Sequence, residues 1–102
     1  MTWWGPESNY NDESGLVIKY GYYDDLYDGD DWEFRYVFDL HNSRLFINVI
    51  GTGEDPESVV KYIEDHFDSR SALEEFCNNN GIHGKCTDIG EYPPALFGPY
   101  EF

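Results

Sequence analysis

The chain has 102 residues, with 6 Lys and Arg against 21 Asp and Glu, so its formal net charge at pH 7 is −15. One domain is expected at this length, and an aromatic content of 19% argues against an acidic disordered chain. The charge excludes nucleic acid and anionic membranes as direct partners, because both need basic protein surface. The first residues lack the basic and apolar regions of a signal peptide, and we expect a cytoplasmic protein.

The first half of the chain predicts a β-meander over residues 16–50. Residues 1–15 are polar and rich in turn formers, so we expect an irregular segment there. Residues 16–23 combine β-branched and aromatic side chains, and residues 33–40 alternate between apolar and polar, as strands do. We expect residues 44–50 to form a third strand, paired with the second across a turn at His41-Asn42-Ser43.

Two helices are predicted over residues 55–80. Asp55 followed by Pro56 is typical of a helix start, and Ser71 with Glu74 three residues later fits a capping box for a second helix. The run from Asn78 to Gly81 is expected to end that helix.

Residues 84–102 predict an edge strand followed by an extended tail rich in proline and aromatic residues. The order of elements indicates an α+β single domain, in which an antiparallel sheet of three to four strands is packed on one face by two short helices. Phe38 and Ile47 are assigned to the core-facing side of the sheet.

Residues that could carry catalysis are sparse, and we expect the protein not to be an enzyme. The three histidines are isolated in the sequence, and Gly51-Thr52-Gly53 lacks the remainder of a phosphate-binding loop. Cys77 and Cys86 are nine positions apart, a spacing that fits neither a redox pair nor a zinc cluster and leaves open whether they form a disulfide. We expect no cofactor and no metal site.

Residues 24–33, here called the acidic segment, contain six carboxylates with aromatic side chains among them. An EF-hand register that places Gly29 at loop position 6 puts Leu26 at position 3 and Arg35 at position 12, so the calcium ligands are missing. Tyrosine and tryptophan beside charge are instead the composition of a protein-binding hot spot. The predicted partner-binding residues are Asp24, Asp25, Tyr27, Asp28, Asp30, Asp31, Trp32 and Glu33.

A strongly acidic domain of this kind is expected to bind a basic protein, such as a nuclease toxin or another nucleic-acid-binding effector, because carboxylates can occupy the Arg and Lys sites that hold phosphates. In size, acidity and layout the chain resembles immunity proteins that neutralise bacterial nuclease toxins. It also resembles phage-encoded nucleic-acid mimics that act as anti-CRISPR or anti-restriction proteins. An acidic interaction adaptor without an inhibitory role is the third alternative.

Overall fold

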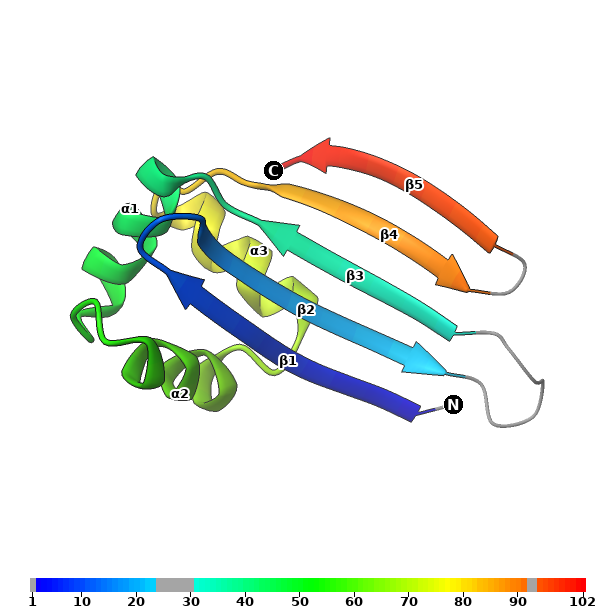
Figure 1. The fold of residues 1–102 in the computed structure, drawn as a ribbon, viewed down its shortest axis with the longest axis horizontal. Coiled ribbons are helices and arrows are strands. Elements are labelled where there is room, and N and C mark those ends of the chain that lie inside the picture. Colours follow the sequence, from blue (N-terminus) through cyan, green and yellow to red (C-terminus); the bar gives the residue numbers. More distant parts are fainter. Residues whose placement is uncertain (1, 24–30, 92–93) are drawn as a thin grey trace.

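The computed structural model describes residues 2–23, 31–91 and 94–102, which form a compact α+β domain (Figure 1). The described chain contains five strands and three helices. In chain order they are β1 (Thr2–Asn11), β2 (Gly15–Tyr23), β3 (Asp31–Val37), α1 (Leu40–Ile50), α2 (Pro56–His66), α3 (Arg70–Asn79), β4 (Lys85–Glu91) and β5 (Pro94–Glu101).

The five strands form one antiparallel sheet in the order β1-β2-β3-β4-β5. The three helices follow one another between β3 and β4, and they pack against one face of the sheet (Figure 1). The predicted α+β class and the one-sided helix layer are therefore confirmed, while the sheet has five strands rather than three or four and the layer has three helices rather than two. In Figure 1 the helices lie under one end of the sheet, and the other ends of the strands project beyond them.

The N-terminal segment, expected to be irregular, is the edge strand β1. Tyr10 on β1 is buried, and β1 pairs with β2 along its length apart from a register shift between Trp4 and Glu7. Gly5 and Pro6 lie at this shift, and Gly5 has a φ of 105°, which favours glycine. An edge strand tolerates a proline that a central strand would not. Because proline usually argues against a strand, the sequence of this segment did not predict one.

The prediction of a strand over residues 44–50 is wrong, because these residues belong to helix α1. The predicted turn at residues 41–43 is the first part of the same helix. Asp39 caps the N-terminus by accepting a hydrogen bond from the Asn42 N–H, and Gly51 ends the helix in the left-handed conformation. Ser43, Phe46 and Ile47 are the buried residues, a spacing that fits one face of a helix.

Helices α2 and α3 confirm the two helices predicted over residues 55–80, although α3 begins earlier than expected. Asp55 caps α2 and Pro56 is its first residue, as expected. Helix α3 begins before the expected capping box, since the Oγ of Ser69, rather than that of Ser71, accepts a hydrogen bond from the Ala72 N–H. Gly81 follows the helix with a φ of 66°.

The predicted edge strand of the C-terminal region is an interior strand. β4 lies between β3 and β5, and the segment expected to be an extended tail forms the edge strand β5. The core fills the space between the helices and the sheet. Phe38 and Ile47 are both buried, as predicted, although Ile47 comes from α1. Cys77 and Cys86 are free thiols within this core.

Candidate protein-interaction surface

The structure separates the predicted partner-binding residues into two groups. Asp24, Asp25, Tyr27, Asp28 and Asp30 lie outside the described residues. Asp31, Trp32 and Glu33 are the first three residues of β3, where only the backbone of Asp31 is described. The end of β2 at Tyr23 and the start of β3 at Asp31 flank residues 24–30 in the sequence, and these strand ends lie where the sheet projects beyond the helices (Figure 1).

Trp32 and Glu33 lie on opposite faces of the sheet, because successive side chains on a strand alternate. Trp32 lies on the helix side, where its ring covers Gly90 of β4, so that a Cβ at Gly90 would meet the ring at 3.1 Å. Glu33 lies on the outer face, where its carboxylate accepts a hydrogen bond from Arg35 Nη2 at 2.7 Å. Because they lie on opposite faces of the sheet, Trp32 and Glu33 cannot both contact a partner that binds to one face.

An aromatic cluster that the sequence analysis missed lies beside Trp32 on the helix side of the sheet. It consists of Trp3 on β1, Tyr22 on β2 and Phe34 on β3. The ring centroid of Trp3 is 4.9 Å from that of Tyr22 and 6.4 Å from that of Phe34. Phe34 is buried, but 59% of Trp3 is exposed, which is unusual for so large an apolar side chain. The cluster therefore offers an accessible aromatic surface at the projecting end of the sheet.

Arg70, the first residue of α3, connects the aromatic cluster with strands β3, β4 and β5. Its Cζ lies 3.7 Å from the centre of the Phe34 ring, a cation–π geometry. Nε donates to the hydroxyl of Tyr36 at 2.9 Å, and Nη2 donates to that of Tyr100 at 3.0 Å. The Asp88 carboxylate lies 3.8 Å from Nη2. The guanidinium is thus held toward β3, β4 and β5 rather than toward β1.

Burial beneath this arrangement raises the pKa values of Tyr20 and Tyr36. For Tyr36 the main cause is loss of solvation, which outweighs the hydrogen bond from Arg70. For Tyr20 burial is again the main cause, and the charge of Asp68 adds to it. Both hydroxyls keep their protons and donate them, Tyr20 to the Phe67 carbonyl at 2.7 Å and Tyr36 to Glu74 Oε2 at 2.9 Å. These bonds fasten the sheet to the C-terminal end of α2 and to the middle of α3.

A groove lies between the start of β1 and the connection from α2 to α3. It has a volume of about 550 Å³ and is lined by Trp3, Gly5, Tyr20, Asp68, Ser69 and Arg70, among others. Asp68 is exposed and makes no ion pair within the described part of the chain. The groove therefore combines an exposed indole with an exposed carboxylate.

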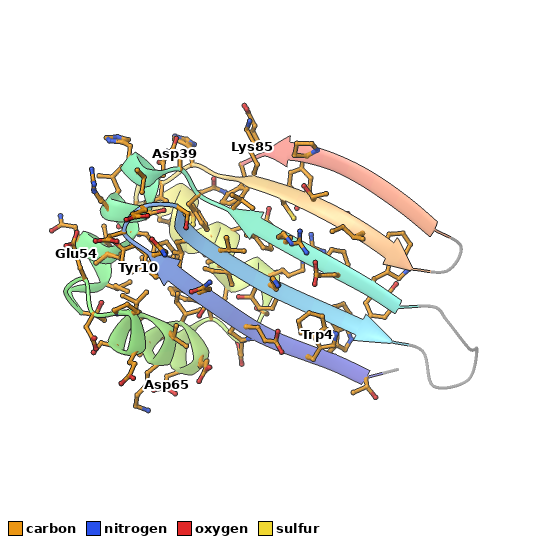
Figure 2. The ribbon with its side chains drawn as sticks, viewed as in Figure 1. Trp4, Tyr10, Asp39, Glu54, Asp65 and Lys85 are labelled. Carbon is orange, nitrogen blue, oxygen red and sulfur yellow. The ribbon has the colours of Figure 1, made fainter. Side chains whose placement is uncertain are left out.

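The charges are unevenly distributed between the two faces of the domain. On the outer face of the sheet, the described strand side chains include three cations and three carboxylates, namely Lys19, Arg35 and Lys85 with Glu7, Glu33 and Glu101. Residues 39–81, which form the helix layer, instead carry nine Asp and Glu against three Lys and Arg. Six exposed carboxylates fall between residues 54 and 68, where Lys61 is the one Lys or Arg. Figure 2 shows Asp65 projecting from α2 away from the sheet.

No grouping of three or more His, Cys, Asp or Glu side chains suited to a metal ion occurs among the described residues. Within the same residues, none of the helices has the length and apolar character needed to cross a membrane. A scan of protein-family models finds no match to this chain, and neither do searches of the curated proteins and of the solved structures.

Proposed function

We propose that this chain is a small acidic inhibitor that binds the basic nucleic-acid-binding or active-site cleft of a nuclease, as an immunity protein binds its toxin. The observation that carries the proposal is the exposed aromatic cluster at the ends of β2 and β3, the two strands that the acidic segment follows and enters in the sequence. Tyr22 and Trp32 are paired across β2 and β3, and the strands lead from there into the acidic segment. Trp3 packs against Tyr22 at the same end of the sheet.

These two features have complementary roles in binding a basic cleft. Carboxylates form charge-assisted hydrogen bonds with the Arg and Lys side chains that otherwise hold phosphates. An exposed tryptophan supplies apolar area that becomes buried on contact, which is typical of interface hot spots. The net charge of −15 would speed encounter with a positively charged partner, and this acceleration weakens as salt is added.

The distribution of charge favours the immunity type of inhibitor over a nucleic-acid mimic. A mimic would present carboxylates in a regular array along an extended face. On the outer face of the sheet, the broadest regular surface described, the cations and carboxylates whose side chains are described balance one another instead. The acid is concentrated in the acidic segment and on the helix layer, as expected for a dedicated protein interface.

The direct test starts with affinity capture of the partner from a lysate of the native host, with mass spectrometry to identify it. Surface-plasmon kinetics then compare the wild-type chain with a variant that carries Asp28→Asn, Asp30→Asn and Asp31→Asn. We expect the triple variant to bind several kcal/mol more weakly, because truncating one partner of a buried charge pair costs about 2–5 kcal/mol. The association rate of the wild type should fall steeply between about 50 and 500 mM salt.

Glu74→Gln is a suitable control, because Glu74 is partly buried and bonded to Tyr36 rather than free for a partner. If the captured partner is a nuclease, stoichiometric addition of this chain should stop its cleavage of nucleic acid. A partner without a basic surface, or an association rate that does not change with salt, would contradict the proposal. Wild-type binding by the triple variant would place the interface elsewhere.

A further inference from the structure

We infer that the groove between β1 and the α2–α3 connection receives an Arg or Lys side chain of the partner, stacked on Trp3 with its charge directed to Asp68. This inference rests on the proposed function, since it names a second contact in the same interface. A cation over the face of an indole is attracted by the ring, and tryptophan is the best aromatic residue for this contact. Trp3 is 59% exposed and lines the groove together with Asp68.

The charges around the groove favour a cation as its occupant. Asp68 has no ion pair among the described residues, and it lies at the end of an exposed acidic stretch that runs from Glu54 along α2. The C-terminus of α2, at Phe67, adds a partial negative charge of the helix dipole beside Asp68.

Two nearby groups could favour an anion instead, but both are already engaged. The guanidinium of Arg70 lies against Phe34 and donates to Tyr36 and Tyr100, on the side of the groove away from β1. At the N-terminus of α3, the Oγ of Ser69 accepts a hydrogen bond from the Ala72 N–H at 3.2 Å. The remaining unsatisfied charge that borders the groove is the carboxylate of Asp68, so an acidic occupant would meet repulsion there.

The indole signals of the intact protein in a proton–nitrogen NMR spectrum provide the test. The chain has three tryptophans, and Trp4 also lines the groove, so the signal of Trp32 serves as the internal control for Trp3. The probe is a hexa-arginine peptide, with hexaglutamate as the opposite charge. We expect hexa-arginine to shift the Trp3 signal saturably in the wild type and in the Asp28, Asp30 and Asp31 triple variant, while hexaglutamate leaves the signal unchanged.

Matched charge variants separate a site from general attraction. Asp68→Asn should raise the apparent Kd for hexa-arginine, read at Trp3, at least fivefold at 150 mM salt. Glu57→Gln removes the same charge at the other end of α2 and should change that Kd less than twofold. Equal effects of the two variants, a shift confined to Trp4 or Trp32, or a shift of Trp3 by hexaglutamate would overturn the inference.

The same variants distinguish failure of this inference from failure of the proposed function. If Trp3→Leu and Asp68→Asn bind the captured partner like the wild type while the triple variant does not, the groove is not a contact and the proposed function stands. If hexa-arginine occupies the groove but the captured partner has no basic surface, the proposed inhibitor function fails and the groove remains a site for cationic side chains.

Discussion

The substitution Gly21→Ala on β2 is predicted to destabilise the wild-type protein but to stabilise a variant that lacks the Trp4 ring. The Trp4 ring lies over Gly21 on the outer face of the sheet, against β2 (Figure 2). A Cβ at Gly21 would overlap the Cε2 and Cζ2 atoms of the Trp4 ring, so Gly21→Ala must displace the indole. The backbone itself accepts alanine, because Gly21 is not among the residues with positive φ.

The cost of Gly21→Ala can be estimated from the area that the ring covers. A tryptophan buries about 150–250 Å², and loss of roughly half of that area at about 25 cal/mol per Å² removes about 2–3 kcal/mol. Alanine is favoured over glycine within a strand by about 0.5–1 kcal/mol. The free energy of unfolding should therefore fall by about 1–2.5 kcal/mol in the wild type and rise by about 0.5–1 kcal/mol in a Trp4→Ala background.

Urea unfolding followed by far-ultraviolet circular dichroism measures this cycle without depending on tryptophan fluorescence. Gly90→Ala is the matched control, because its Cβ would meet the Trp32 ring at 3.1 Å and requires only a small movement. Gly90→Ala should cost less than Gly21→Ala. If Gly21→Ala destabilises the Trp4→Ala protein as much as the wild type, the ring is not the reason for glycine at this position.

Two further predictions concern the core. Phe46→Ala should cost about 3–5 kcal/mol through the cavity it leaves, whereas Val49→Ala, at an exposed position of α1, should cost less than about 0.5 kcal/mol; urea midpoints that rank them the other way would indicate a strand. Burial, aided by Glu74, raises the pKa of the Cys77 thiol to about 12, and burial also raises the pKa values of the core tyrosines Tyr20 and Tyr36. The unfolded chain releases these protons at lower pH, with its thiols titrating at about 8.5. The contribution of these groups to the free energy of unfolding is therefore fully present below about pH 8.5 and should fall as pH rises toward 12. A urea midpoint that rises between about pH 8.5 and 10.5 would contradict this.

The helices of residues 55–80 could be predicted because their signals are local. Asp55 and Pro56 are adjacent at the start of α2, and Val59 and Ile63 are buried one helical turn apart. A cap and an apolar stripe within one short stretch are sufficient to specify a surface helix. The start of α3 was predicted wrongly, because Ser69 and Ser71 are both suitable caps. A local signal does not distinguish them, and packing selects Ser69.

Helix α1 was missed because its composition favours a strand. Residues 44–50 contain Ile47, Val49 and Ile50, and β-branched residues have a higher propensity for strands than for helices. The caps at Asp39 and Gly51, eleven residues of helix apart, were the available signal. They determine the outcome together with packing, because burial of Phe46 against Phe38 and Phe67 requires the helical spacing.

The aromatic cluster could not be predicted from local sequence, because its members come from three strands. Trp3 meets Tyr22 only through the register of β1 on β2, and Phe34 joins them through the register of β2 on β3. The two tryptophans at positions 3 and 4 also point to opposite faces, so only Trp3 belongs to the cluster. Regular alternation over residues 2–11 would have placed Trp4, not Trp3, on the face of Tyr10. The register shift between Trp4 and Glu7, which the sequence does not specify, brings Trp3 to that face.

The construction of the sheet edges restricts how a partner can bind. Both edge strands carry a Gly-Pro pair at a register shift, Gly5-Pro6 in β1 and Gly98-Pro99 in β5. Proline lacks the N–H that an added strand would use, and a bulge turns the neighbouring backbone away, so these edges are poor templates for pairing with another chain. The net charge of −15 also opposes self-association. In the proposed complex the partner is therefore expected to bind through side chains. Trp3 is the most exposed large aromatic side chain described, and it lines the same groove as Asp68, where we propose that a cationic side chain binds.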